Sequence, residues 1–267
     1  YGGSAPTTSY CTNDKTGRGP SWANSLFEDN AEYGLGMLEG GDILRNRAKQ
    51  HLIAHKDEFK PETRAAVDAW VEGFEDKENT LALSDRLVEA LNAETGEAAE
   101  KALALKKYFS KKSQWIFGGD GWAYDIGFGG IDHVLASGRD VNILVLDTEV
   151  YSNTGGQASK STPVSAVAKF AASGMKLRKK DLGKMMMSYG YIYVAQVAMG
   201  ANQAHYLKVL KEAESFPGPS LVIAYAPCIN HGLKASMGKS QAEEKKAVEC
   251  GYWHLFRFDP RLEAQGK

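Results

Sequence analysis

Two short apolar runs separated by a helical stretch constrain the fold of this chain more than any other feature. The first run is Trp115-Ile116-Phe117, and the second covers residues 142–146. Each run has the length of a buried strand and is followed at once by glycines or polar residues. Both segments are therefore predicted to be buried strands.

The segment between these strands, residues 123–137, has the spacing of an amphipathic helix, and Gly138 stands where helices commonly end. A strand, a helix and a second strand in this order form a crossover unit, which joins parallel strands. The predicted fold class is therefore α/β, with a doubly wound, mostly parallel sheet. The apolar positions on one side of the predicted helix are Ile126, Ile131, Val134 and Leu135.

Polar residues follow both strands at the points where the strands end. Asp120 comes just after the first strand and Thr148 just after the second. The carboxyl ends of parallel strands meet at one edge of the sheet, where open α/β sheets bind their ligands. Glycines at positions 118, 119 and 121 let backbone approach a ligand, and the N–H groups of the next helix can face a phosphate. This edge is predicted to bind a phosphorylated ligand.

A carboxylate among phosphate-binding backbone groups requires a cation, because the carboxylate and a diphosphate repel each other. Mg²⁺ prefers oxygen ligands in nearly octahedral geometry. Asp120 can provide a carboxylate oxygen, Thr148 a hydroxyl and Val150 its backbone carbonyl, while phosphate oxygens and a water complete the six. We therefore predict a Mg²⁺ site formed by Asp120, Thr148 and Val150.

The spacing of these groups resembles the diphosphate motif of thiamine-diphosphate enzymes. Gly119-Asp120-Gly121 is separated by 26 residues from the sequence TEVYSN at positions 148–153. Most enzymes of this kind have Asn where this chain has Thr148. The cofactor-binding residues that the resemblance implies are Gly119, Asp120, Gly121, Trp122, Thr148, Glu149, Val150, Tyr151, Ser152 and Asn153.

Three longer blocks narrow the resemblance to the C-terminal thiamine-diphosphate-binding domain of the pyruvate:ferredoxin (flavodoxin) oxidoreductase family. The blocks are GRGPSWANSLFEDNAEYGLGM at 17–37, SNTGGQASKSTP at 152–163 and YAPCINHG at 225–232. The resemblance covers nearly the whole chain, although residues 40–112 match only in patches. It implies oxidative decarboxylation of pyruvate with coenzyme A to acetyl-CoA and CO₂. Electrons would pass through [4Fe-4S] clusters to ferredoxin or flavodoxin.

The same resemblance assigns roles to two further side chains. Asn153 would contact the substrate, since its amide both donates and accepts hydrogen bonds. Cys228 would be one of the four thiolates on the cluster nearest the thiamine. A four-iron cluster needs four such ligands, whereas the chain has three cysteines and no C-x-x-C spacing. The other ligands are therefore expected in other domains of the same polypeptide.

Several further expectations concern the rest of the enzyme. The chain starts at Tyr1 rather than Met, which we interpret as a piece of a longer polypeptide that forms a homodimer. No residue here is assigned to the glutamate that activates the aminopyrimidine of thiamine, so the isolated chain is expected to be inactive. His231 could tune the cluster through a hydrogen bond. Cys11 has no assigned role, and Cys250 is expected to be an idle thiol.

Composition excludes other classes of function. The net charge is −1, and no basic stripe interleaved with aromatic residues indicates nucleic-acid binding. No apolar run approaches the roughly 20 residues of a membrane helix, and the N-terminal residues do not resemble a signal peptide. The cytoplasm is the expected location.

The chain as a whole, residues 1–267, is predicted to be one thiamine-diphosphate-binding domain. Residues 1–38 would form an extended loop and a first helix from Ser21 toward Gly36, residues 39–112 a helical region, and residues 113–267 the α/β core. Residues 152–165 are predicted to be a functional loop at the ligand edge. Further strands are expected at 191–198, 221–226 and, on a sheet edge, 253–258, and further helices at 166–172, 179–188, 202–216 and 239–249.

Three alternatives remain open on the sequence alone. The chain could belong to an oxidoreductase for another 2-oxoacid, or to a thiamine-diphosphate decarboxylase without clusters. It could also be a noncatalytic nucleotide- or diphosphate-binding module, in which Gly-Asp-Gly only turns the chain.

Overall fold

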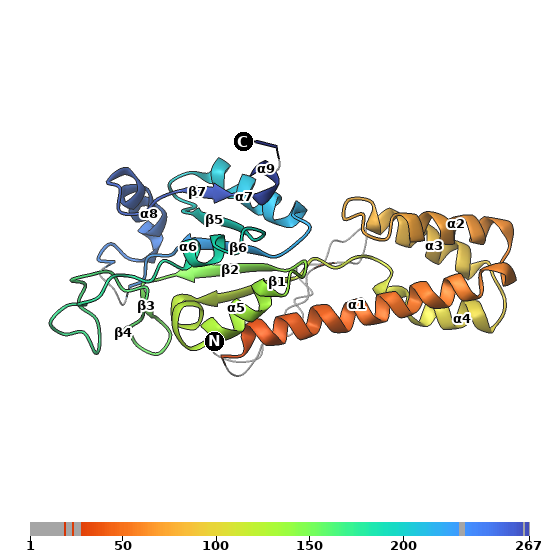
Figure 1. Ribbon diagram of the computed structural model, residues 1–267, viewed down its shortest axis with the longest axis horizontal. Helices are drawn as coiled ribbons and strands as arrows, with labels where there is room; N and C mark the ends of the chain where they lie inside the picture. The colour runs from red at the N-terminus through yellow and green to blue at the C-terminus, as the bar shows by residue number, and fades with distance from the viewer. Residues whose placement is uncertain (1–18, 20–22, 24–27, 230–232, 264, 267) are drawn as a thin grey trace. The chain divides into compact units, whose positions relative to one another are not determined.

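The computed structural model describes residues 19, 23, 28–229, 233–263, 265 and 266 (Figure 1). The chain divides into two compact units. One is Leu35–Gln114, and the other combines Tyr1–Gly34 with Trp115–Lys267. Cys11 and His231 lie outside the described residues, and so do most of residues 21–27, where the first helix was predicted to begin.

The first helix is longer than the sequence predicted. Helix α1 runs from Asn30 to Ala54 and passes through Gly36 without a break. Glycine lowers helix stability by about 1 kcal/mol without ending a helix, and the later turns of α1 place Ala48 and Leu52 in the apolar core of the helical unit. Tertiary packing therefore outweighs the local stop signal at Gly36.

The helical unit is built on an apolar core contributed by all of its main helices. Trp70 is almost fully buried in this core, and its indole N–H donates to the backbone carbonyl of Phe109 at 3.0 Å. Amphipathic spacing in residues 39–108 predicted several helices here, and the structure has them. They are α2 (Pro61–Glu72), α3 (Thr80–Asn92) and α4 (Glu97–Ala104), with short 3-10 turns at Lys56–Glu58 and Lys106–Tyr108.

The second unit contains the predicted mostly parallel sheet. Its strand order is β1-β2-β6-β5-β7, and only β7 at the edge is antiparallel (Figure 1). All the predicted strands are present, and the edge strand is shorter than predicted. They are β1 (Trp115–Gly119), β2 (Asn142–Asp147), β5 (Tyr193–Val197), β6 (Ser220–Tyr225) and β7 (Phe256–Phe258).

Helices cover both faces of this sheet, as a doubly wound fold requires. Helix α7 (Gln203–Ser215) packs Val209 and Ala213 against the face that carries Val222 of β6. Helix α6 (Leu182–Met187) approaches Ile223, the next residue of β6, whose side chain points to the opposite face. The sheet interior is therefore buried on both sides, and its carboxyl edge is left for ligands.

The crossover from β1 to β2 differs from the single predicted helix. It starts as a π-helix, Gly121–Ile126, and continues after Gly127 as α5, Phe128–Ala136. Ile131, Val134 and Leu135 are fully buried as predicted, but Ile126 is 58% exposed. A π-helix has more residues per turn than an α-helix, and the helix is interrupted at Gly127. Ile126 therefore does not share a face with the buried residues of α5, and the sequence pattern did not indicate this change.

The segment predicted as a helix at residues 166–172 is instead irregular. Lys169 donates its N–H to the carbonyl of Gly156 and accepts from the N–H of Ala158. Phe170 adopts a left-handed φ of 65°, which interrupts a right-handed helix. The segment extends a hairpin made of β3 (Val150–Tyr151) and β4 (Gln157–Ala158), and this hairpin occupies part of the predicted functional loop.

The remaining elements follow the predicted order. Residues predicted as helices at 202–216 and 239–249 form α7 and α8 (Ser240–Glu249), and residues 179–188 contain the shorter α6. A 3-10 turn at Met237–Lys239 precedes α8, and α9 (Pro260–Glu263) follows β7. Among the described residues, none of the helices combines the length and the apolar character needed to cross a bilayer.

Candidate functional site

Asp120 and Thr148 meet at the carboxyl edge of the sheet, as their positions after β1 and β2 predicted. The parallel register pairs Gly119 with Leu146, so the two residues that follow the strands become neighbours. Thr148 donates its backbone N–H to Asp120 Oδ1 at 3.1 Å, and its Oγ1 lies 2.7 Å from the same carboxylate oxygen.

The backbone carbonyl of Val150 joins this pair. Thr148 Oγ1 lies 2.9 Å from the Val150 carbonyl oxygen, on the first residue of the hairpin. The Thr148 hydroxyl has one proton and can donate it to only one of these two oxygens. Lone pairs of the hydroxyl, the carboxylate and the carbonyl therefore face one another here. The predicted ligand set of a carboxylate, a hydroxyl and a carbonyl is therefore gathered in one place. Consistent with a single carboxylate in this set, the described residues contain no cluster of three His, Cys, Asp or Glu side chains that could hold a metal.

Two serines hold the other oxygen of Asp120. Ser159 and Ser161 both donate to Oδ2, the latter at 2.8 Å. They reach it because the hairpin returns the chain to the end of β1. The sequence analysis placed both serines in a functional loop without assigning them a role. The two serines flank Lys160 in a turn, in which the N–H of Thr162 donates to the carbonyl of Ser159 at 3.1 Å, and the turn places both hydroxyls on Asp120.

Burial dominates the electrostatics of Asp120, whose side chain is fully buried. Burial, and after it the charge of Asp147, raises the pKa of Asp120 above the ordinary aspartate value, although hydrogen bonds from Ser159, Thr148 and Ser161 oppose the shift. Protons and a metal ion compete for such a carboxylate. A divalent cation at this position would offset the unfavourable charge.

Glycines in and next to the Gly-Asp-Gly motif make room for neighbouring rings. A Cβ at Gly121 would lie 2.4 Å from ring atoms of Tyr151, the second residue of β3. A Cβ at Gly118 would lie 2.2 Å from the indole of Trp122. Trp122 is buried, so its side chain fills the interior, and its backbone is the part available to a phosphate.

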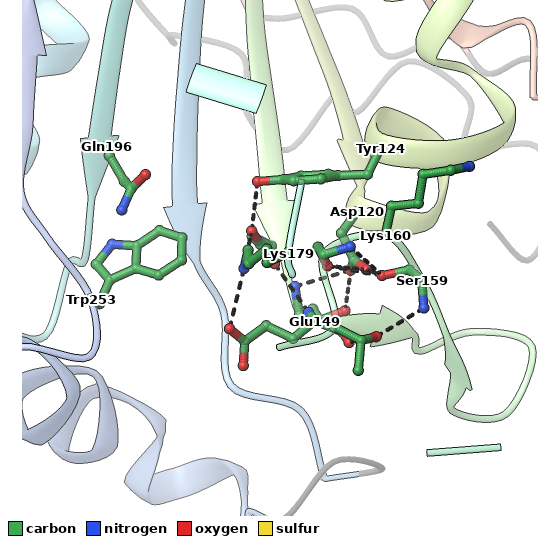
Figure 2. A network of polar contacts seen from close by, with 12 residues as sticks. Asp120, Tyr124, Glu149, Ser159, Lys160, Lys179, Gln196 and Trp253 are labelled. Carbon is green, nitrogen blue, oxygen red and sulfur yellow. Dashed lines mark hydrogen bonds and ion pairs between the residues drawn. The ribbon is translucent and has the colours of Figure 1, made fainter. Parts of the chain in front are cut away.

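The oxygens of Asp120, Thr148 and Val150 form a group that we call the oxygen cluster. Beside it lies a network of two buried carboxylates and the half-buried Lys179 (Figure 2). Lys179 Nζ is 2.8 Å from Asp147 Oδ2 and 3.2 Å from Glu149 Oε1, and in Figure 2 dashed contacts lead from Tyr124 past Lys179 to Glu149. Burial raises the pKa of Glu149, against the lowering charge of Lys179. Burial alone would lower the pKa of Lys179, but the charges of Asp147 and Glu149 outweigh it and raise that pKa.

The remaining predicted residues take different positions. Asn153 is exposed at the hairpin turn. Its side chain makes no hydrogen bond to any residue that the structure describes, so the side chain does not hold the turn. Cys228 is half-buried and follows β6, the strand next to β2, which places it after the same sheet edge. Lys160, which lies between Ser159 and Ser161 and was not a predicted site residue, pairs with Asp125 at 3.1 Å.

Sequence comparison identifies the family. The model of the thiamine pyrophosphate enzyme C-terminal TPP-binding domain matches residues 83–224, which is more than half of the chain. The chain belongs to this family. The TPP-binding domain match runs from α3 to β6 and includes the whole oxygen cluster, so the residues gathered at the carboxyl edge lie inside the matched domain.

Similar proteins of this TPP-binding family are much longer than the chain. Pyruvate-flavodoxin oxidoreductase of Klebsiella pneumoniae is 59% identical over 270 residues, which cover 100% of the chain and 23% of that protein. Pyruvate:ferredoxin oxidoreductase of Moorella thermoacetica is 52% identical over 278 residues, with the same coverages of 100% and 23%. The chain thus spans about a quarter of the length of these relatives.

A solved structure shows a weaker likeness. A 2-oxoglutarate:ferredoxin oxidoreductase from Magnetococcus marinus, with 2-oxoglutarate, coenzyme A and succinyl-CoA bound, is 23% identical. The match covers 47% of the chain and 43% of that chain, with a TM-score of 0.42.

Proposed function

We propose that the chain binds thiamine diphosphate through a Mg²⁺ ion held by Asp120 Oδ1, Thr148 Oγ1 and the Val150 carbonyl oxygen. The observation that carries this proposal is the spacing of these oxygens, 2.7 and 2.9 Å from the central hydroxyl. Mg²⁺ bonds of 2.0–2.1 Å in an octahedron separate adjacent ligands by about 2.9 Å. Both distances from the Thr148 hydroxyl therefore match the spacing of adjacent ligands in a Mg²⁺ octahedron.

Charge balance supports the same assignment. Asp120, Asp147 and Glu149 are buried carboxylates, and Lys179 is the ammonium that contacts two of them. When all four groups are ionised, their formal charge is −2. Buried charge is costly unless it is compensated, and a divalent cation would neutralise this group. The proposed cofactor-binding set is completed by Gly119, Gly121, Trp122, Glu149, Tyr151, Ser152 and Asn153.

We infer that the chain is the cofactor-binding part of an oxidoreductase that oxidises pyruvate with coenzyme A. Identity of 59% and 52% along the whole chain to pyruvate oxidoreductases supports this activity. When bound, thiamine diphosphate would act as the electron sink for decarboxylation, and this chain would hold the diphosphate, orient the cofactor and exclude water. Ferredoxin or flavodoxin would accept the electrons by way of a [4Fe-4S] cluster that Cys228 helps to hold.

Other parts of the same polypeptide are needed for this activity. The cofactor requires a second surface for its aminopyrimidine, and the cluster requires thiolates besides Cys228. The isolated chain is therefore proposed to be inactive. A single thiamine-diphosphate-binding domain over residues 1–267, homodimeric assembly and a cytoplasmic location stay predictions from the sequence.

Calorimetry on the complete oxidoreductase, freed of cofactor, tests the binding function. Thiamine diphosphate with Mg²⁺ is expected to bind at least about 100-fold more tightly than ADP with Mg²⁺, a difference of about 2.7 kcal/mol. Addition of EDTA should greatly weaken the binding of thiamine diphosphate, because its diphosphate would then face Asp120 without a cation. Equal affinities for the two diphosphates would instead favour a general diphosphate-binding module.

The proposed role of Asn153 predicts a selective defect. Asn153→Ala is expected to lower kcat/KM for pyruvate by about 10- to 100-fold, the effect of losing one hydrogen bond to a charged group. Thiamine diphosphate affinity should stay within about threefold of wild type, since the amide is not among the proposed Mg²⁺ ligands. Steady-state kinetics with Asn92→Ala as a control, the same change at an exposed helix end, checks this. Equal kinetics for both variants would remove Asn153 from the substrate site.

A further inference from the structure

The two residues that flank Thr148 both carry buried carboxylates, and one lysine contacts both. The side chains of Asp147 and Glu149 are 0% and 5% exposed. Lys179, 30 residues beyond Glu149 in the chain, places its ammonium 2.8 Å from the first and 3.2 Å from the second. Two buried carboxylates that contact the same ammonium repel each other, so their arrangement depends on that ammonium.

Uncharged hydroxyl groups also donate hydrogen bonds to both carboxylates. Tyr124 donates its hydroxyl to Asp147 Oδ2 at 2.8 Å, and Tyr252 donates to Glu149 at distances of 2.8 and 2.9 Å from its two oxygens. The ring of Trp253 lies 5.1 Å from Lys179 Nζ. Residues from three separate segments therefore converge on the sequence Asp147-Thr148-Glu149.

The backbone between these residues has an unfavourable conformation. Glu149 adopts a φ of 64°, which costs a non-glycine residue about 1–3 kcal/mol and persists where surrounding contacts enforce it. The enforcing contacts include the N–H of Glu149, which donates to Asp147 at 3.1 Å, and its carbonyl, which accepts from Thr162 at 2.6 Å. The turn at Glu149 brings the Val150 carbonyl back to within 2.9 Å of Thr148 Oγ1.

We propose that Lys179 is a positioning residue for the metal site. By neutralising the carboxylates on either side of Thr148, it holds the left-handed turn at Glu149 and thus the spacing of Thr148 Oγ1 and the Val150 carbonyl that receives Mg²⁺. Lys179 itself touches neither the metal nor the diphosphate. This inference rests on the proposed function. It adds to the proposed metal site a residue that is not itself one of the Mg²⁺ ligands.

Mn²⁺ titration of the cofactor-free complete oxidoreductase, with saturating thiamine diphosphate and free Mn²⁺ followed by electron paramagnetic resonance, tests this role. Lys179→Met is expected to raise the Mn²⁺ dissociation constant by about 10- to 100-fold, the usual effect of losing a residue that orients metal ligands. Lys176→Met is the matched control, because Lys176 is exposed in the same segment and, among the residues that the structure describes, its Nζ donates to the Ser173 carbonyl alone. The control should bind Mn²⁺ as the wild type does.

A double variant separates charge neutralisation from packing of the lysine stem. Lys179→Met combined with Glu149→Gln has the formal charge of the wild-type network, and it is expected to bind Mn²⁺ at least about tenfold more tightly than Lys179→Met alone. A double variant that binds no better, or a Lys179→Met variant that binds like Lys176→Met, would overturn the proposal. If Lys179→Met does not fold, the double variant is compared with wild type. Binding within about tenfold then supports the proposal, and a loss as large as that of Asp120→Asn overturns it.

Asp120→Asn is the reference variant that distinguishes a failure of the proposed metal site from a failure of the positioning role of Lys179. If this variant binds Mn²⁺ as tightly as wild type, the proposed metal site is wrong and the role of Lys179 falls with it. If Asp120→Asn loses Mn²⁺ while Lys179→Met does not, the metal site stands and only the positioning role fails.

Discussion

Pyruvate oxidation by the complete oxidoreductase is expected to fall by about 1,000-fold or more when Asp120 is replaced by asparagine. The reason is the loss of the only carboxylate among the three proposed Mg²⁺ ligands. An amide oxygen carries no charge, and a loss of about 4 kcal/mol in metal-dependent stabilisation corresponds to this factor. Asparagine has nearly the same shape. Its oxygen can accept from the Thr148 N–H, and its NH2 group can donate to the hydroxyl oxygens of Ser159 and Ser161, so the fold is expected to survive.

Steady-state turnover and thiamine diphosphate affinity measure the effect of Asp120→Asn. Both should fall, and excess Mg²⁺ should recover part of the loss, because weakened binding responds to concentration. Asp68→Asn makes the same change at an exposed position of the helical unit and should leave both quantities unchanged. If the two variants oxidise pyruvate equally well, Asp120 does not hold the metal.

Replacement of Cys228 by alanine is expected to remove one iron–sulfur cluster from the complete oxidoreductase. A [4Fe-4S] cluster held by three thiolates instead of four is unstable, so iron content should fall by about four atoms per polypeptide. Ferredoxin reduction should fall by at least about 100-fold, whereas binding of thiamine diphosphate should persist because Asp120, Thr148 and Val150 are unchanged.

Cys250 provides the control for this experiment. It is exposed at the end of α8, and its thiol contacts the carbonyl of Ala247 at 3.5 Å. Cys250→Ala is expected to retain iron, the visible spectrum of the clusters and full ferredoxin reduction. Full iron content in Cys228→Ala would remove Cys228 from the ligand set and would favour a decarboxylase-like role for the domain.

The sheet and the meeting of Asp120 with Thr148 could be predicted because both follow from local rules. Short apolar runs define strands, a helical crossover makes the strands parallel, and parallel strands place the residues after them at one edge. The helix after β7 and the hairpin of β3 and β4 were not predicted, since each contains only a few residues. The hairpin matters most, because it brings Ser159 to Asp120.

The identity of the half-buried lysine that reaches Asp147 could not be predicted from local rules. The sequence KLRKK at 176–180 contains four cations, and nothing in their order distinguishes Lys179, which reaches Asp147, from Lys176, which stays in solvent. The prediction of a helix at 166–172 was wrong for a related reason. Its alanine-rich sequence has helical propensity, but contacts with the hairpin outweigh propensity in so short a segment.

The most direct measurement of the central claim is an anomalous-scattering map of the complete oxidoreductase crystallised with Mn²⁺ and thiamine diphosphate. We predict one manganese peak about 2.2 Å from Asp120 Oδ1, Thr148 Oγ1 and the Val150 carbonyl oxygen, in contact with the diphosphate. A manganese peak on the diphosphate that touches none of these three oxygens would contradict the account.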